Sequence, residues 1–377
     1  MFRSVFRLSV LAAACLCLPS HGAAQSWADG QGQQAAVPPT QFEQMNDPQP
    51  LTRIGPNGEP LLVARGRSVI IRPGLRGLYI TQEGQPRVVA TTRQEFTLER
   101  GYNSMRIRPL NREEQIMLPA RDVIPDGQAG KGQSTIAEAW LIQPTDRYDH
   151  GVLGDDIEAG ALRVVTRDNR FAIHRLTDGS VFEGTKPLVG DVDGDGRDEV
   201  LVVNSSHQGG SALHIYRVMD QPDGRISLQL MAEGPRLGRK HRWLNPVGIG
   251  DFNLDGQPEI AVVETPHLDG TLKVYRMVNG RLREVVRATG FSNHALGSAQ
   301  TGMHLIRDLT GDNRPDLVIP DTDRERLRIM TMTGDQLHEV GLLLLPSKAM
   351  TDILWIDEAL TLGLEDNSVL SLSVFIQ

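Results

Sequence analysis

One acidic sequence occurs three times in this chain of 377 residues, and it constrains the fold more than any other feature. It reads GDVDGDGRDEVLVV from Gly190, GDFNLDGQPEIAVV from Gly250 and RDLTGDNRPDLVIP from Arg307. The leading aspartates are 60 and 57 residues apart. Similarity at such a period indicates a repeat architecture, in which each unit buries its apolar face against its neighbours.

Beyond residue 50, apolar residues come in short runs interrupted by glycine, asparagine and aspartate, and few segments keep a helical period for three turns. Such runs, bounded by turn residues, are typical of β-strands. Each acidic copy is followed by two further strand-like runs, so the repeat unit corresponds to a four-stranded blade. The sequence therefore predicts an all-β fold, a β-propeller of about six or seven four-stranded blades, some of them degenerate. The clearest runs are Val200–Val203, Leu213–Tyr216, Ile260–Val263, Leu272–Tyr275 and Leu317–Ile319.

Two flanking segments have the features of degenerate copies. Gly154–Glu158 and Asp352–Asp357 precede strand-like runs but lack the full acidic pattern, so we expect no metal in those blades. The early strand near Leu61–Ile71 is expected to complete the truncated last copy, because a closed ring leaves few strand edges exposed. The predicted propeller spans residues 51–377.

The first 24 residues have the features of a secretory signal peptide. Two arginines precede an apolar run from Leu8 to Leu18, and small residues follow as far as Ala24. This run is shorter than the roughly 20 apolar residues that a membrane-spanning helix needs, and a buried N-terminal helix is the alternative. Cleavage near Ala24 removes Cys15 and Cys17, the only cysteines of the chain, and no transmembrane segment is expected in the mature protein. Lipid anchoring at Cys15 is not expected, because Ala12 stands where such sites usually carry leucine.

Residues 25–50 are rich in glutamine and proline and predict a flexible linker. Loss of residues 1–24 removes two arginines and no acid, so the net charge changes from −8 to −10. That charge does not favour contact with nucleic acid. We therefore expect a periplasmic or secreted protein with no nucleic-acid partner.

Oxygen-bearing side chains stand at alternate positions of each acidic loop. Counted from the leading aspartate, positions 1, 3, 5 and 9 offer side-chain oxygens and position 7 offers a backbone carbonyl. Ca²⁺ takes six to eight oxygen ligands in flexible geometry, whereas Mg²⁺ requires a stricter octahedron, so the pattern favours calcium. Solvated Asp/Gly turns are the alternative. The expected ligands are Asp191, Asp193, Asp195, Arg197 and Glu199; Asp251, Asn253, Asp255, Gln257 and Glu259; and Asp308, Thr310, Asp312, Arg314 and Asp316.

The acidic motif and its two sister copies resemble the FG-GAP/VCBS repeats of integrin-type β-propellers and of many exported bacterial proteins. The resemblance is specific over about residues 190–320. It implies that each loop joins the first and second strands of a blade and binds structural Ca²⁺, at up to three sites. It also implies a VCBS-repeat protein of exported bacterial type.

In such a propeller, the loops joining strands two to three, and each blade to the next, lie on the face opposite the acidic loops. They are rich in histidine, asparagine and arginine, and could converge on one pocket for a polar or anionic ligand such as a sugar or peptide. The alternative is that they are ordinary loop residues and that the tryptophan fills a gap between blades. A transition metal on His207, His267 and His294 is a further alternative. The candidates are His207, His241, Arg242, Trp243, Asn245, His267, Asn293 and His294.

No common catalytic motif occurs in the sequence, and the carboxylates are better explained as metal ligands than as an acid–base pair. We therefore expect an exported, calcium-binding β-propeller that acts as a binding or scaffolding module for a protein or glycan partner. A secreted hydrolase or polysaccharide lyase, with its site on the face opposite the calcium loops, is the main alternative. A receptor-like domain that assembles with a membrane complex is a third.

Overall fold

The computed structural model describes residues 41–45, 50–52, 62–72, 74–81, 84–101, 104–110 and 122–376. The predicted signal peptide, with Cys15 and Cys17, lies outside these residues, as does most of the predicted linker. The chain divides into Met1–Pro38 and Pro39–Gln377, and only the second unit contains described residues. Its regular secondary structure, within that described part, consists of β-strands alone.

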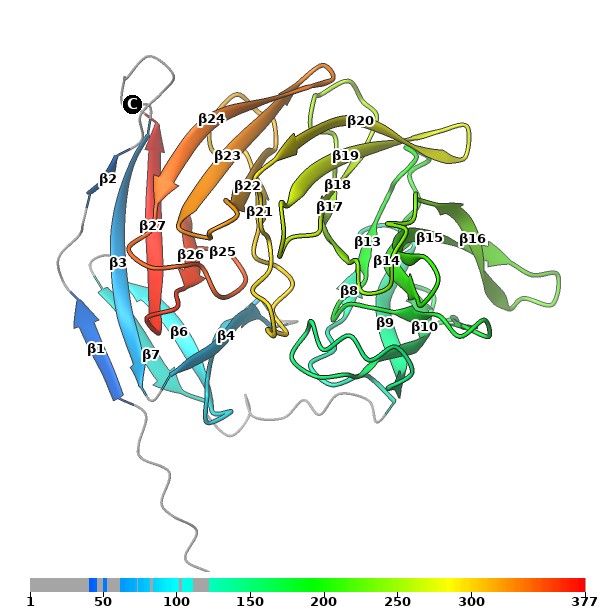
Figure 1. Ribbon diagram of the computed structural model, residues 1–377, viewed down its shortest axis with the longest axis horizontal. Coiled ribbons are helices and arrows are strands. Elements are labelled where there is room, and N and C mark those ends of the chain that lie inside the picture. Colours follow the sequence, from blue (N-terminus) through cyan, green and yellow to red (C-terminus); the bar gives the residue numbers. More distant parts are fainter. Residues whose placement is uncertain are drawn as a thin grey trace, which may run out of the picture. The chain divides into compact units, whose positions relative to one another are not determined.

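The strands form six four-stranded antiparallel units, which we call blades 1 to 6 (Figure 1). The first strands of neighbouring blades contact one another, as β13 and β17 do, and β17 and β21. The bounds are β4 (Leu75–Ile80), β5 (Pro86–Ala90), β6 (Glu95–Gly101) and β7 (Ser104–Pro109) in blade 1; β8 (Gly130–Lys131), β9 (Ile136–Thr145), β10 (Glu158–Thr166) and β11 (Phe171–Arg175) in blade 2; β13 (Leu188–Gly190), β14 (Glu199–Ser206), β15 (Gly210–Asp220) and β16 (Ile226–Glu233) in blade 3; β17 (Leu244–Gly250), β18 (Glu259–Glu264), β19 (Thr271–Val278) and β20 (Arg281–Thr289) in blade 4; β21 (Leu305–Arg307), β22 (Asp316–Pro320), β23 (Arg326–Thr333) and β24 (Gln336–Leu344) in blade 5; and β25 (Leu354–Ile356), β26 (Ala359–Gly363), β27 (Ser368–Ile376) and β3 (Leu62–Arg72) in blade 6. The prediction of an all-β propeller is confirmed, and the described residues form six blades.

Blade 6 combines strands from the two ends of the described chain. β3 pairs with β27 in antiparallel register from Ile70 opposite Ser368 to Leu62 opposite Ile376. The early strand therefore completes the last blade, as the sequence predicted. Two short strands, β1 (Gln41–Met45) and β2 (Pro50–Thr52), pair with the outer edge of β3. Pairing thus begins inside the segment assigned to the linker, because the backbone groups along a strand edge can accept an added strand of almost any composition.

The second strands of blades 3 to 6 are buried at every residue except Ser206 at the end of β14, because each lies between two neighbouring blades. This burial of β14, β18, β22 and β26 explains why their sequences are continuous apolar runs rather than alternating ones. Separate hydrophobic clusters join blades 2 and 3, 3 and 4, 4 and 5, 5 and 6, and 6 and 1. Among the described residues no such cluster joins blades 1 and 2.

In blade 2, the acidic segment lies in a different connection from the one expected. Gly154–Glu158, interpreted above as a degenerate acidic loop, lies mainly in the connection between β9 and β10, the second and third strands. The connection between its first and second strands is the short segment Gly132–Thr135, whose sequence has no acidic residue. A further short strand, β12 (Val181–Phe182), pairs with both β10 and β14 and so joins blades 2 and 3 into one nine-stranded sheet.

Candidate metal centres and the opposite loop face

The three acidic segments connect the first and second strands of blades 3, 4 and 5. We call them loop 1 (Asp191–Glu199), loop 2 (Asp251–Glu259) and loop 3 (Asp308–Asp316). Their backbones turn at the same two places, because positions 4 and 6 have positive φ angles of 58° to 84° in all three. The residues at these positions are Gly194, Leu254 and Gly311, and Gly196, Gly256 and Asn313.

The first aspartate of each loop makes the same hydrogen bond. Its Oδ2 accepts the backbone N–H of position 6, at 2.8 Å for Asp191, 2.9 Å for Asp251 and 2.8 Å for Asp308. At position 7, the backbone N–H groups of Arg197, Gln257 and Arg314 donate to the carboxylate at position 5. The loops are therefore ordered by their own carboxylates in the same way, as their sequence similarity predicts.

Loop 1 gathers the most carboxylates. One side-chain oxygen from each of Asp191, Asp193 and Asp195 lies within 4.8 Å of the others, so a single cation could contact all three. Among the described His, Cys, Asp and Glu residues, no other group of three meets that limit. In loops 2 and 3, Asn253 and Thr310 stand at the third position and offer neutral oxygens instead.

The acid at position 9 of each loop is buried at the start of the second strand. Glu199, Glu259 and Asp316 are each at most 1% exposed. One carboxylate oxygen of each accepts a backbone N–H from its own loop, namely those of Val192 (3.2 Å), Phe252 (2.9 Å) and Leu309 (2.8 Å). Burial raises the pKa of Glu199 to about 7 and also raises the pKa values of Glu259 and Asp316, since removal from water disfavours the charged form.

An arginine from the third strand reaches loops 1 and 2. In loop 1, Nη2 of Arg217 lies 2.8 Å from Asp193, 3.8 Å from Asp195 and 3.7 Å from Glu199. In loop 2, Arg276 is paired opposite Glu259, contacts its carboxylate, and has Nη2 2.9 Å from Asp255. Each guanidinium therefore supplies positive charge among the carboxylates expected to bind metal.

Loop 3 has no such arginine. Leu317 pairs with Met330, so Thr331 is the residue beside Asp316 on the neighbouring strand. Oδ1 of Asp316 and Oγ1 of Thr310 are buried without a hydrogen-bond partner in the described part of the protein. A buried carboxylate oxygen that lacks a donor is costly. These unpaired oxygens, in a donor set made of oxygen alone, fit a hard cation such as Ca²⁺.

Asp198, which the sequence analysis did not single out, joins two blades. Its carboxylate accepts four backbone N–H groups of blade 2, from Gln133 (3.2 Å), Ser134 (2.8 Å), Thr135 (2.8 Å) and Ile136 (3.0 Å). Burial alone would raise the pKa of this carboxyl, but these hydrogen bonds outweigh burial and hold it below its usual value. Asp198 thus stabilises the contact between blades 2 and 3.

The residues predicted to form one pocket lie at the end of the blades opposite loops 1 to 3, Asn245 at the start of β17 and the others in connections. That placement follows from the antiparallel order of the strands within each blade. The structure brings the side chains together in two groups rather than one. In the first, His207 and His241 both contact Tyr148, with ring centroids 5.3 and 5.4 Å from it. The second group is centred on Trp243.

Trp243 is only 3% exposed and belongs to the hydrophobic cluster between blades 3 and 4. Its ring stacks on His267 at 6.0 Å and meets the edge of His294 at 4.9 Å, and Nε2 of His267 lies 2.7 Å from Nδ1 of His294. Burial lowers the pKa of His267 to about 4 and that of His294 to about 3, so both rings are neutral at pH 7. The position of Trp243 matches the alternative given above, a side chain that fills the space between blades.

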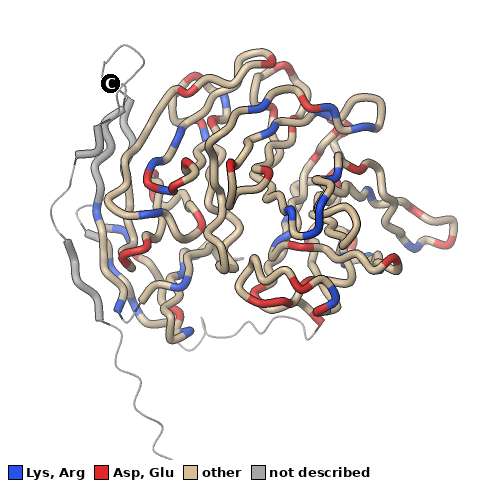
Figure 2. Tube along the Cα trace, viewed as in Figure 1, with Lys and Arg blue, Asp and Glu red and all other residues tan. Residues whose placement is uncertain are grey.

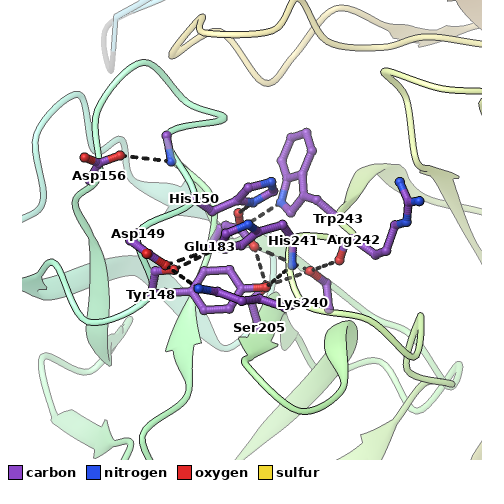
Figure 3. Close-up of polar contacts among 12 residues, drawn as sticks. Tyr148, Asp149, His150, Asp156, Glu183, Ser205, Lys240, His241, Arg242 and Trp243 are labelled. Carbon is purple, nitrogen blue, oxygen red and sulfur yellow. Dashed lines mark hydrogen bonds and ion pairs between the residues drawn. The ribbon is translucent and has the colours of Figure 1, made fainter.

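The remaining candidates also make contacts within the protein. Asn245 and Asn293 are buried, and each side-chain amide donates to the other residue's backbone carbonyl, both at 3.2 Å. The backbone carbonyl of Arg242 accepts the hydroxyl of Ser211 at 2.8 Å. Figure 3 shows the side chain of Arg242 directed away from Tyr148 and Glu183.

A buried carboxylate at this end of the blades was not found by sequence reasoning. Glu183 is 1% exposed; it contacts Nδ1 of His150 and accepts the hydroxyl of Ser205 (Figure 3). The imidazole of His150 stacks on that of His241 with centroids 4.6 Å apart and an interplanar angle of 4°. No sequence motif marks Glu183 or His150, since they lie 33 residues apart in connections of different type.

A cavity of about 2160 Å³ is lined by residues of blades 1 and 2, together with Lys186–Val189 and Gly297–Gln300. Both signs of charge line it, including Arg76, Arg87 and Lys186, and Asp126 and Glu138. Across the described residues, Asp and Glu are spread over many loops and alternate with Lys and Arg (Figure 2). The described part of the chain has no helix that is long and apolar enough to cross a membrane.

Comparison with known proteins gives one family match. The FG-GAP-like repeat model matches residues 191–262, which contain loops 1 and 2. No curated protein matches the chain. Similar solved structures are the WD40 domain of Toxoplasma gondii coronin (8% identity, 90% of this chain and 87% of that one, TM-score 0.42), virginiamycin B lyase from Staphylococcus aureus (13%, 89% and 99%, 0.36) and BamB from Moraxella catarrhalis (13%, 83% and 82%, 0.29).

The matched segment begins at the first aspartate of loop 1 and ends within the second strand of blade 4. It therefore covers one full period of the repeat seen in the sequence. The chain carries an FG-GAP-like repeat at residues 191–262, set within an all-β propeller of four-stranded blades.

Proposed function

We propose that this protein is an exported, calcium-stabilised β-propeller that acts as a binding module for a protein or glycan partner. The observation that carries the calcium proposal is the recurrence of one oxygen-lined loop in three blades, with three carboxylates gathered in loop 1 and an unpaired buried carboxylate oxygen in loop 3. Side-chain oxygens at positions 1, 3, 5 and 9, with the carbonyl at position 7, would hold the ion. When bound, Ca²⁺ would neutralise these carboxylates and fix each loop.

Calcium should raise the stability of the folded state by a measurable amount. Extracellular calcium modules bind at roughly 10⁻⁴ M, so about 1 mM Ca²⁺ adds about 1.4 kcal/mol per site. We expect EDTA to lower the melting temperature of the purified protein and added Ca²⁺ to restore it, with Mg²⁺ less effective. Isothermal titration calorimetry should detect binding at up to three sites. An identical melting curve in EDTA and in Ca²⁺ would refute the calcium proposal.

The proposed binding role rests on the face opposite loops 1 to 3, where the connections of several blades carry exposed side chains of mixed chemistry. His207 and Arg239 are exposed there, as are Leu268 (49%) and Leu296 (73%). A face that exposes both apolar and basic side chains suits a protein or glycan surface rather than a small ligand. Substitution of Leu296 and Arg239 should weaken partner binding, measured by glycan array and by cross-linking in the native host, while substitution of exposed Asp223 at the opposite end should not.

The proposed export by a cleaved signal peptide can be tested separately. N-terminal sequencing of the protein isolated from its native host should begin near residue 25 and the protein should be found outside the cytoplasm. A mature chain that retains Met1–Ala24 would contradict export by a cleaved signal peptide.

A secreted hydrolase or lyase remains the second candidate because of the contact between Glu183 and His150. A buried carboxylate that accepts Nδ1–H leaves a lone pair on Nε2, which is the form of imidazole that accepts a proton in general base catalysis. Turnover of a polysaccharide or ester that is lost in both His150→Gln and Glu183→Gln, with the fold intact by circular dichroism, would support this candidate. Absence of turnover across such a panel would oppose it.

A further inference from the structure

In two of the three loops, an arginine from the third strand of the blade lies among the carboxylates. Arg217 in blade 3 and Arg276 in blade 4 occupy equivalent places on the third strand: Val200 pairs with Tyr216, which places Arg217 beside Glu199, and Glu259 pairs with Arg276 directly. Each guanidinium contacts carboxylates at two or more of the odd positions of its loop. These are the positions at which the proposed function places calcium ligands.

The charges show why an arginine is needed when no metal is bound. Loop 1 offers carboxylates at positions 1, 3, 5 and 9, and like charges this close repel one another. Arg217 is largely buried against them, with its side chain 32% exposed, and Arg276 more so, at 17%. Each arginine thus offsets part of the repulsion that would otherwise open its loop.

Loop 3 is the natural comparison, because it has the same backbone shape but no arginine from the third strand. Its own Arg314 has Nη1 4.0 Å from Oδ2 of Asp312. Thr331 stands at the equivalent place, and Oδ1 of Asp316, which corresponds to the oxygen that Arg276 contacts on Glu259, has no partner. The ion pairs at positions 5 and 9 of loops 1 and 2 therefore come from the third-strand arginines and not from the shape of the loop backbone.

We propose that Arg217 and Arg276 are internal counter-ions that occupy the calcium positions of loops 1 and 2 and are displaced when Ca²⁺ binds. This inference rests on the proposed function, in that it takes the loops to be calcium sites. The arginines keep blades 3 and 4 folded at low calcium and lower the affinity of their loops for the ion. Loop 3, which has no third-strand arginine beside its buried acid Asp316, depends on the ion itself.

The test compares the wild type with Arg217→Gln/Arg276→Gln, in EDTA and in a calcium titration. Loss of the guanidinium should lower the melting temperature in EDTA. It should also tighten Ca²⁺ binding by about tenfold or more, because a unit charge within about 5 Å of a divalent ion costs at least this much even when well screened. Arg217→Lys/Arg276→Lys keeps the charge and should stay close to the wild-type affinity. Arg225→Gln, which removes an exposed arginine paired with Asp223 beyond the loops, is the matched control and should change neither quantity.

The outcomes separate the two proposals. If the wild type binds no Ca²⁺, the proposed function fails, and a lower melting temperature of the glutamine variant in EDTA then shows only that the arginines stabilise the loops. If the wild type binds Ca²⁺ and the glutamine variant binds it equally well or more weakly, the arginines support the ion instead of competing with it, and this inference is overturned. Should the double variant fail to fold, each single variant gives the same comparison for its own loop.

Discussion

Substitution of Asp198, a buried residue of loop 1, should lower the stability of the protein more than substitution of most other loop residues. Its carboxylate accepts four backbone N–H groups, from Gln133 to Ile136, and is 4% exposed. Hydrogen bonds to a charged group contribute about 1.5–3 kcal/mol each, but four bonds to one carboxylate share its desolvation, and removal of a buried charged partner costs about 3–5 kcal/mol. We expect Asp198→Ala to lower the free energy of unfolding by about 3–5 kcal/mol and Asp198→Asn, which still accepts hydrogen bonds through one oxygen, by less.

The measurement is urea denaturation followed by circular dichroism, in EDTA so that bound metal contributes nothing. The effect should also depend on pH. Because hydrogen bonding depresses the pKa of Asp198 in the folded state, its contribution is present above the unfolded pKa and is lost as pH falls through the folded value. The difference between wild type and Asp198→Asn should therefore shrink under acid conditions. Asp223→Asn, in an exposed turn, is the control and should leave the unfolding midpoint unchanged. A loss below about 1 kcal/mol for Asp198→Ala would refute the claim that this carboxylate joins blades 2 and 3.

Two further predictions concern single residues. Leu254 has a φ of 58° where loops 1 and 3 have glycine, and its side chain is 49% exposed. Leu254→Gly should therefore relieve about 1–2 kcal/mol of backbone strain while losing little packing, and should raise the free energy of unfolding, measured by urea denaturation, by about 0.5–1 kcal/mol. A net loss of stability would contradict this. Burial, and then the charge of Glu183, raises the pKa of Glu158 from 4.5 to about 8, so folding becomes less favourable as pH rises through that range. Glu158→Gln should therefore gain stability over the wild type between pH 5 and pH 8, whereas a constant difference at all pH values would argue against a buried neutral carboxyl.

Much of the fold could be predicted from the sequence because it repeats. The continuous apolar runs, such as Val200–Val203, are buried on both sides as second strands of blades, and the acidic segments are the connections that precede them. The closure of the ring by the early strand was also predictable, since the last copy lacks one strand and β3 supplies it. These inferences succeed because local pattern and global fold agree in a repeat protein.

Features that depend on contacts between distant segments could not be predicted in the same way. The pattern Asp155–Asp156 in blade 2 looked like a loop copy, but its strands place it at the other end of the blade. Trp243 was a candidate for an open binding platform, and only its neighbours in blades 3 and 4 show that it is buried. Glu183 and His150 meet through the fold alone and carry no motif.

The three acidic loops show why contacts between distant segments matter for the calcium proposal. From the sequence alone, the three acidic loops are expected to depend equally on a bound divalent cation. The structure distinguishes them, because Arg217 and Arg276 follow their loops by 18 and 17 residues and return to them only through strand pairing, whereas Asp316 is left with a buried oxygen unpaired. If calcium stabilises this propeller, its effect should therefore be unequal among the blades. Amide hydrogen exchange in EDTA should show loop 3 opening more readily than loops 1 and 2, since in those two an arginine lies beside the buried acid at position 9, whereas Arg314 of loop 3 lies 4.0 Å from the exposed Asp312.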